Sequence, residues 1–253
     1  MLTQRQQKIL TLIEDTSRVR VEDLALRFAT SPQTIRKDLQ ALAGLHHIVR
    51  FHGGATLIGG AEYTAAAERQ AEALPAKIAI GAAVAARLPP SGAVFLNSGT
   101  TTVQVVRMMT DARQLRIIVD NVDTAAEIRA YPGIEAIVPG GMVRRGDGAI
   151  LGAEAVDYIR QFRPDYAVIG AAAVAEDGAL LDYDLAEVQV CRAMMDKARH
   201  VILAVDATKF RRNAPVRLGH LSAIHTLVTD DAVPAWVAPL CAECEVDLVI
   251  APS

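Results

Sequence analysis

The sequence predicts an α/β protein with two unequal parts, a small helical segment followed by a larger domain of alternating helices and strands. Apolar residues make up 51% of the 253 residues but aromatic ones only 4%, which suits aliphatic helices packed on a mostly parallel sheet. Charge separates the same two parts. The first 57 residues hold eight bases and five acids, a net +3, whereas the remainder holds 18 bases and 24 acids, a net −6. A basic segment joined to an acidic body is typical of nucleic-acid contact.

Several classes of protein are not expected from this sequence. No apolar run approaches the roughly 18 residues of a membrane span, and no apolar signal-peptide core follows Met1–Arg5, so we expect a cytoplasmic protein without membrane contact. Three cysteines cannot form a closed disulfide framework. Cys241 and Cys244 form a C-x-x-C pair with no second pair of zinc ligands nearby, and whether it has a redox role stays open. No metal, cofactor or catalytic residue is expected.

Three short helices are predicted at the N-terminus. Apolar residues spaced by three to four positions indicate a first helix through Ile9–Ile13 and a second over Val21–Phe28. Ala29 and Thr30 form the predicted turn. Ser31 is suited to cap a third helix and Pro32 to its first position, so this helix is expected to run to about Ala43.

The start of the third helix carries the side chains expected to contact DNA. When its apolar residues face inward, polar and basic side chains face outward near its N-terminus, the end that enters the major groove in helix-turn-helix proteins. A strand pattern from Ile48, a turn at Gly53-Gly54 and a return to Leu57 predict a β-hairpin wing. Amide, hydroxyl and basic groups can read base edges or pair with phosphates. The predicted DNA-binding residues are Ser31, Gln33, Thr34, Arg36, Lys37, Arg50 and His52. A purely structural bundle is the alternative.

Three segments of this region, Arg5–Leu10, Ser31–Leu39 and Arg50–Ala55, resemble the signature of the DeoR family of repressors. That family usually has a second arginine where this chain has Lys37, which keeps the charge but loses the bidentate fork of a guanidinium. The resemblance implies a winged helix-turn-helix repressor that binds operator DNA as a homodimer or homotetramer. An activator would use the same residues.

The larger domain is predicted to span residues 77–253, after a partly helical linker over residues 58–76 that could act as a hinge. Alternation of strands and helices favours a largely parallel, Rossmann-like sheet. No G-x-G-x-x-G follows a strand and no phosphate-binding P-loop motif occurs, so a dinucleotide is not expected. The predicted helices are Lys77–Leu88, Thr102–Met109, Thr124–Tyr131, Ala153–Phe162, Glu187–Ala198 and Pro234–Glu243. The predicted strands are Ala93–Leu96, Leu115–Val119, Ile134–Val138, Asp165–Ile169, His200–Val205, Thr226–Thr229 and Val246–Ile250.

Ligands of such sheets bind at the carboxyl ends of the strands, where four places carry suitable chemistry. Asn97–Thr102 offers backbone N–H groups and hydroxyls to an anion, or only a helix cap. Gly140-Gly141 allows close approach of a ligand, or forms a plain turn. Lys209 can bind phosphate, or is only a solvated lysine. A loop bearing Asp182, Asp184 and Glu187 can accept hydrogen bonds from hydroxyls, or complements a helix dipole.

The larger domain also resembles the DeoR sensor domain, which is similar in fold to ribose-5-phosphate isomerase. Segments such as Asp147–Gly152 and Val205–Ala214 resemble members that respond to sn-glycerol 3-phosphate, which implies this inducer and the control of glycerol or sugar catabolic genes. The family usually has Asp at position 97 and Asn at position 120, so another sugar phosphate stays open as the ligand. An aldose–ketose phosphate isomerase with Asp182, Asp184 or Glu187 as base is the rival from another class. The effector-binding residues expected are Ser98, Gly99, Thr100, Thr101, Thr102, Asn121, Gly140, Gly141, Asp184, Glu187 and Lys209.

Overall fold

The computed structural model describes residues 2–16, 18–44, 48–51, 53–57, 70–109 and 113–252. The chain divides into two compact units, the first made of residues 1–69 and 145–147 and the second of residues 70–144 and 148–253. We call them the N-terminal unit and the sensor unit and describe each by itself. No helix within the described ranges is long and apolar enough to cross a membrane.

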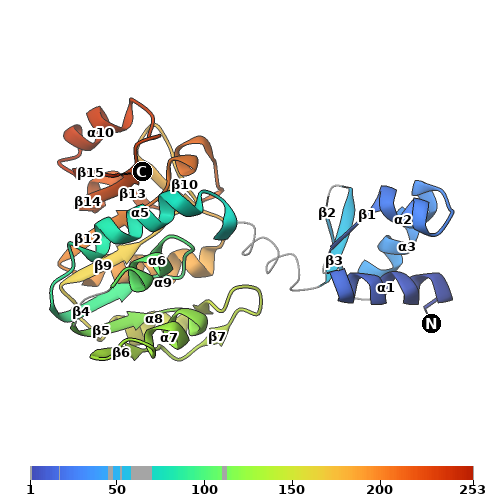
Figure 1. Ribbon diagram of the computed structural model, residues 1–253, viewed down its shortest axis with the longest axis horizontal. Coiled ribbons are helices and arrows are strands. Elements are labelled where there is room, and N and C mark those ends of the chain that lie inside the picture. Colours follow the sequence, from blue (N-terminus) through green and yellow to red (C-terminus); the bar gives the residue numbers. More distant parts are fainter. Residues whose placement is uncertain are drawn as a thin grey trace. The chain divides into compact units, whose positions relative to one another are not determined.

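The described residues of the N-terminal unit form three helices and a small antiparallel sheet (Figure 1). Its strands are ordered β1-β3-β2, with β3 paired to both neighbours. One buried apolar cluster holds the unit together, with Ile13, Leu24, Ile35 and Leu42 among its members. These features confirm the predicted helices and hairpin and add a third strand, β1, which is too short to be recognised in the sequence. The elements are α1 (Gln4–Thr16), β1 (Arg18–Arg20), α2 (Val21–Arg27), α3 (Pro32–Gly44), β2 (Ile48–Phe51) and β3 (Gly54–Leu57).

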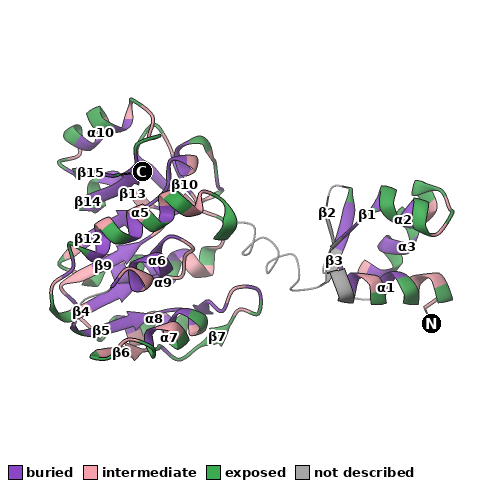
Figure 2. Ribbon diagram, viewed as in Figure 1, coloured by how far each residue is buried: buried purple, intermediate pink, exposed green. Residues whose placement is uncertain are grey.

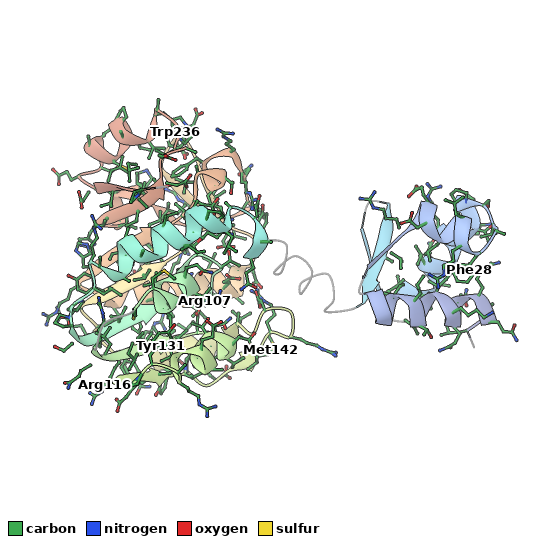
Figure 3. The ribbon with its side chains drawn as sticks, in the orientation of Figure 1. Phe28, Arg107, Arg116, Tyr131, Met142 and Trp236 are labelled. Carbon is green, nitrogen blue, oxygen red and sulfur yellow. The ribbon has the colours of Figure 1, made fainter. Side chains whose placement is uncertain are left out.

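The turn between α2 and α3 closes both helix ends with hydrogen bonds. The N–H of Thr30 donates to the carbonyl of Ala25 at 3.0 Å, and Ala29 between them has a φ of 47°, as in a Schellman cap. Ser31 Oγ accepts a hydrogen bond from the Thr34 N–H at 3.1 Å, which satisfies a donor at the start of α3. Phe28, labelled in Figure 3, precedes this turn and packs against the apolar cluster of the unit.

The sensor unit is built on a parallel seven-stranded sheet with the order β15-β14-β12-β9-β4-β5-β6. The strand order reverses between β4 and β9, because β5 and β6 extend the sheet on one side of this point and β12, β14 and β15 on the other. This arrangement confirms the predicted α/β fold. The strands are β4 (Ser91–Leu96), β5 (Gln114–Val119), β6 (Ile134–Ile137), β9 (Tyr166–Ile169), β12 (His200–Ala204), β14 (Thr226–Asp230) and β15 (Asp247–Ala251).

Helices cover both faces of this sheet. Val94 and Leu96 of β4 belong to the same buried cluster as Ile80 of α5, whereas Phe95 between them belongs to a cluster with Met194 of α9. The sheet is therefore apolar on both faces, as a parallel sheet between two helical layers requires, and Figure 2 shows its strands as largely buried. The helices are α5 (Leu74–Ala85), α6 (Thr102–Arg107) and α7 (Val122–Ile128) on the first side and α8 (Ala153–Ile159), α9 (Leu185–Lys197) and α10 (Val237–Glu243) on the second.

A second, antiparallel sheet with the order β10-β11-β13 was not predicted. Its strands are short, and β11 pairs with β13 far along the chain, where Leu180 lies opposite Gly219. No local sequence pattern therefore predicts this sheet. Asp182 ends β11, which corrects its expected placement on a loop. The remaining elements are β7 (Met142–Val143), β8 (Ile150–Leu151), β10 (Ala173–Val174), β11 (Ala179–Asp182), β13 (Val216–His220) and the 3-10 helices η1 (Ala207–Arg211) and η2 (Leu221–Ala223).

The first helix of the sensor unit begins earlier than predicted. Helix α5 starts at Leu74, inside the segment expected to be linker, rather than at Lys77. Ala73 before it has a φ of 52°, and Pro75 in the first turn needs no backbone N–H partner. Lys77 therefore lies within a helix instead of at its start, and this difference affects the site described below.

Candidate functional site

The exposed face of α3 carries the side chains predicted to contact DNA. Gln33, Arg36 and Lys37 are exposed and Thr34 is partly exposed, while Ile35 is buried. Arg50 lies in β2 opposite Ala55, and His52 lies outside the described residues. A helix that is apolar on one side and presents amide and basic groups on the other can enter a major groove.

The charged residue that follows Lys37 is buried and joins α3 to α1. Asp38 is 5% exposed. Arg5 donates its Nε–H to Asp38 Oδ2 at 2.6 Å, and Gln6 donates to Oδ1 at 3.2 Å. The hydrogen bond and charge of Asp38 raise the pKa of Arg5 above its usual value. The sequence analysis missed this contact, although Asp38 lies one helical turn from both Ile35 and Leu42 and so falls on the inward side of α3.

In the sensor unit, Asn97 joins the two strands between which the strand order reverses. It follows β4, and its Oδ1 accepts the N–H of Gly170, the residue after β9, at 2.9 Å. Its Nδ2 faces Cys191 Sγ of α9 at 3.7 Å. Both ends of the Asn97 amide are therefore used within the protein, at the edge of the sheet where ligands of this fold class bind.

The predicted anion loop after Asn97 is held in shape by Thr102. The Thr102 hydroxyl lies 2.7 Å from the carbonyl oxygen of Asn97 and 3.1 Å from that of Gly99, so it stabilises the loop. A Cβ on Gly99 would lie 2.9 Å from the same hydroxyl, which explains the glycine. Ser98, Gly99 and Thr100 are partly exposed, whereas Thr101 and Thr102 are buried.

Asn121 brings the end of β5 to this loop. Its Nδ2 donates to Ser98 Oγ at 2.9 Å, and its Oδ1 accepts the Thr124 N–H at 2.9 Å and so caps α7. Because Ser98 Oγ accepts from Asn121, its own O–H stays available as a donor. The structure thus places two of the predicted effector residues in direct contact.

The two predicted acidic residues of α9 share one arginine. Arg144 donates to Asp184 Oδ2 and to Glu187 Oε2, each at 2.8 Å. Asp184 Oδ1 also caps α9 by accepting the Ala186 N–H at 2.8 Å. Sequence reasoning missed Arg144, because its partners are 40 and 43 residues away along the chain.

Next to this group lies a buried carboxyl group that follows β5. Asp120 is 1% exposed. Burial, followed by the charge of Glu187, raises the pKa of Asp120 well above its usual value, and the Ser98 N–H and Arg144 offset this only in part. Burial also raises the pKa of the Cys191 thiol, with the charges of Asp120, Asp182 and Glu187 adding to the effect. These contacts and charges bring together Ser98, Asp120, Asn121, Arg144, Glu187 and Cys191. We call these residues the β4–β5 cluster.

A second cluster at the same edge of the sheet contains two buried lysines. Lys209 in η1 is 6% exposed and Lys77 in α5 is 1% exposed, so Lys209 is not the solvated lysine considered as an alternative. The pKa of Lys77 is lowered to about 8, mainly by burial; the charges of Lys209 and Arg212 add to this effect, and those of Asp206 and Glu72 oppose it. We call Lys77, Lys209 and Arg212 the cationic cluster. Lys77 was missed because the predicted helix began three residues too late.

The position of Lys209 is fixed by its neighbours along the chain. Asp206 caps η1 through the Thr208 N–H at 3.1 Å. Phe210 makes an edge-to-face contact with Trp236, labelled in Figure 3, at a centroid distance of 5.7 Å. These contacts hold η1, and with it Lys209, at the carboxyl end of β12.

The glycine pair after β6 has a structural explanation of its own. Gly141 has a φ of 145°, and a Cβ there would lie 2.7 Å from the carbonyl oxygen of Leu151 in β8. The close approach of β7 and β8 thus requires Gly141 without any ligand, and Gly140 is exposed. Within the described residues, no group of three or more His, Cys, Asp or Glu side chains is arranged as a metal site.

Comparison with protein families gives matches in both units. A model of the DeoR-like helix-turn-helix domain matches residues 5–60, and one of the DeoR C terminal sensor domain matches residues 72–231. The glycerol-3-phosphate regulon repressor of Escherichia coli K12 is 35% identical, covering 97% of this chain and 98% of that protein. Its counterpart in Haemophilus influenzae is 38% identical, with coverage of 97% and 96%.

Further relatives and solved structures extend this list. The HTH-type transcriptional repressor CsqR of Escherichia coli K12 is 32% identical, covering 97% of this chain and 94% of that protein. Among solved structures, ribose 5 phosphate isomerase A from Neisseria gonorrhoeae matches with a TM-score of 0.40 and 8% identity, covering 53% of this chain and 52% of that one.

Proposed function

This chain belongs to the DeoR family, and from that premise we propose that it is a transcriptional repressor released from operator DNA by a phosphorylated small molecule, sn-glycerol 3-phosphate. The observation that carries the proposal is the exposed face of α3, where Gln33, Arg36 and Lys37 extend from a helix whose opposite side is locked to α1 by Arg5 and Asp38. Rigid presentation of such a face suits direct reading of bases. Relatives that match 97% of the chain carry the name of repressors.

The cationic cluster supports a phosphorylated ligand. Lys77 and Lys209 are both buried, and the pKa of Lys77 is lowered by burial first and also by the charge of Lys209. A dianionic phosphate between them and the loop Ser98–Thr102 would relieve this repulsion and gain charge-assisted hydrogen bonds. We assign the phosphate end of the inducer to this place, in keeping with the names of the relatives.

The β4–β5 cluster supports hydroxyl groups on the same ligand. Ser98 keeps a free O–H, because its oxygen accepts from Asn121. Glu187 lies close enough to Asp120 for its charge to raise the pKa of that group, and a carboxylate accepts hydrogen bonds from hydroxyl groups. A polyol phosphate uses both kinds of group, which is why we prefer sn-glycerol 3-phosphate to a phosphate without hydroxyls.

Release requires only a modest difference in affinity between two states of the protein. A hundredfold loss of operator binding corresponds to roughly 2.7 kcal/mol of coupling. A few hydrogen bonds made in one state alone supply this amount. We further propose that the repressor acts as a homodimer or homotetramer, because half-sites about 34–36 Å apart on one face of DNA need two copies of α3.

The chain is a regulator and not an isomerase. The named relatives that cover it are repressors. Arg144 pairs with both Asp184 and Glu187, so each of these carboxylates has an arginine partner within the protein. A turnover assay with ribose 5-phosphate is expected to give no product.

The proposal is tested by fluorescence anisotropy of a labelled fragment from upstream of the gene and its neighbours, at one fixed salt concentration. We expect binding that resists competitor DNA, and loss of that binding on addition of sn-glycerol 3-phosphate. If only a different sugar phosphate releases the DNA, the assignment as a repressor stands but sn-glycerol 3-phosphate is rejected as the inducer. Absence of specific binding to every fragment would reject the repressor itself.

A further inference from the structure

One buried carboxyl oxygen in the β4–β5 cluster lacks a partner. Asp120 Oδ1 has less than 1 Å² of exposed surface and no hydrogen-bond partner among the described residues. The backbone on either side is fixed, since the Asp120 carbonyl accepts the Ile150 N–H at 2.7 Å. A buried polar atom left without a hydrogen bond costs about 1–3 kcal/mol, and such atoms are rare enough in folded proteins to require an explanation.

The equivalent position on the neighbouring strand is already satisfied. Asn97 follows β4 as Asp120 follows β5, and both ends of its amide are bound, by Gly170 and Cys191. The end of β4 therefore carries an amide with partners at both ends, whereas the end of β5 carries a carboxyl group with one oxygen that has none among the described residues.

We propose that Asp120 is a specificity-determining residue of the sensor unit, whose Oδ1 makes a hydrogen bond to a hydroxyl group of the bound ligand. The inference rests on the proposed function and names the ligand class more narrowly, as a phosphorylated polyol with a hydroxyl near the β5 end. The end of β5 that leads into α7 is visible in Figure 1.

The surroundings of Asp120 suit a hydroxyl better than an ion. Burial and the neighbouring Glu187 favour the neutral form of the carboxyl group, because both raise its pKa. A neutral carboxyl can donate one hydrogen bond and accept another, which matches the capacity of an alcohol. A phosphate at this position would face Glu187 and Asp182, whose charges also act on Cys191. The phosphate therefore belongs at the cationic cluster and the hydroxyl at Asp120.

The test compares two ligands and two side chains in one cycle. The ligands are sn-glycerol 3-phosphate and 1-propyl phosphate, which share the phosphate and the three-carbon chain but differ in hydroxyl groups. Their affinities for the full-length protein are measured by calorimetry for wild type and Asp120→Ala. Loss of this hydrogen bond is expected to lower the affinity of Asp120→Ala for sn-glycerol 3-phosphate about tenfold and its affinity for 1-propyl phosphate less than about twofold. Asp120→Asn, which keeps an acceptor and a donor, restores most of the selectivity.

The control variant is Asp157→Asn, which removes a carboxyl group from an exposed part of α8. It is expected to bind both ligands as wild type does. If Asp120→Ala loses the same affinity for both ligands, or loses none for either, the inference is overturned, but the assignment of the chain as a repressor is not affected. If wild type binds neither ligand, the proposed inducer fails and this inference fails with it.

A second measurement works without the alanine variant, in case that variant does not fold. Infrared difference spectra of wild type labelled with ¹³C-aspartate report the carboxyl C=O stretch on ligand addition. We expect a shift with sn-glycerol 3-phosphate that is absent with 1-propyl phosphate and absent in Asp120→Asn. The same spectrum with both ligands would contradict the assigned hydrogen bond.

Discussion

The Nε of Arg5 lies 2.6 Å from Oδ2 of Asp38, and this pair links α1 to α3, the helix proposed to read DNA. Asp38 is buried, so it depends on Arg5 and Gln6 for its hydrogen bonds. The exposed residues of α3 owe their fixed orientation to a pair that itself lies on the other side of the helix. Mutations that affect operator binding are therefore expected on both sides of α3.

Arg5→Ala is expected to lower operator affinity although it removes no side chain of the exposed α3 face. The substitution leaves a buried carboxylate with Gln6 as its remaining partner, which destabilises the packing of α1 on α3. Operator binding by anisotropy and urea unfolding followed by circular dichroism check this result. Arg160→Ala, which changes the exposed arginine at the C-cap of α8, is the control. Wild-type values for Arg5→Ala in both measurements would show that the pair is not needed.

Arg36→Ala and Lys37→Ala are each expected to weaken specific operator binding by about 1–3 kcal/mol while leaving the affinity for sn-glycerol 3-phosphate unchanged. Both side chains are exposed on α3. Anisotropy over a range of salt concentrations separates their roles, because loss of a phosphate contact lowers the salt slope by about 1 whereas loss of a base contact relaxes sequence preference. Normal operator affinity in both variants would reject α3 as the reading helix.

Ala29→Gly is expected to stabilise the N-terminal unit. Ala29 has a φ of 47°, a conformation that costs an L-residue about 1–2 kcal/mol and glycine almost nothing. Part of that gain is offset by the greater freedom of glycine in the unfolded chain. We expect a net increase of roughly 0.5–1 kcal/mol in the free energy of unfolding, measured with urea. A decrease would mean that the Ala29 side chain contributes packing that outweighs the backbone strain.

Lys77→Met is expected to raise the melting temperature of the ligand-free protein and to weaken the binding of phosphorylated ligands. Burial lowers the pKa of Lys77 to about 8, so between about pH 8 and its unfolded pKa near 10.4 the unfolded chain binds more protons than the folded one. Lys77 therefore makes wild-type stability rise with pH across that window. Ligand affinity is expected to fall over the same range as the ammonium loses its charge.

Thermal melts from pH 7 to 10.5, with and without sn-glycerol 3-phosphate, check both statements about Lys77. Lys197→Met changes an exposed lysine at the end of α9 and should behave as wild type. If Lys77→Met keeps the full stabilisation by the ligand, Lys77 does not contact the phosphate.

The main sheet was predictable because its strands are apolar runs set between helical patterns. Ile117–Val119 and Val201–Leu203 are buried on both faces, which a parallel sheet demands and which is visible in the sequence. The sheet β10-β11-β13 was not predictable, because β10 has only two residues and β11 pairs with β13 across more than thirty residues, which leaves no local pattern. Because this sheet was not predicted, Asp182 was expected on a loop instead of at the end of β11.

The residues of the candidate site were likewise predictable only in part. Ser98 and Asn121 could be expected together, because each follows a strand at the carboxyl edge of one sheet. Arg144 and Lys77 could not, because their importance comes from burial beside groups distant along the chain. Asp120 was noticed only as a departure from a pattern, and its unpartnered oxygen became apparent only in three dimensions.

The most direct test of the account is to titrate the complex of full-length protein and labelled operator with sn-glycerol 3-phosphate, in wild type and in the variant Lys77→Met, Lys209→Met. The account predicts that wild type is released with a loss of operator affinity of about a hundredfold, whereas the variant binds operator normally and is not released. Release of both proteins at the same ligand concentration, or of neither, would contradict it.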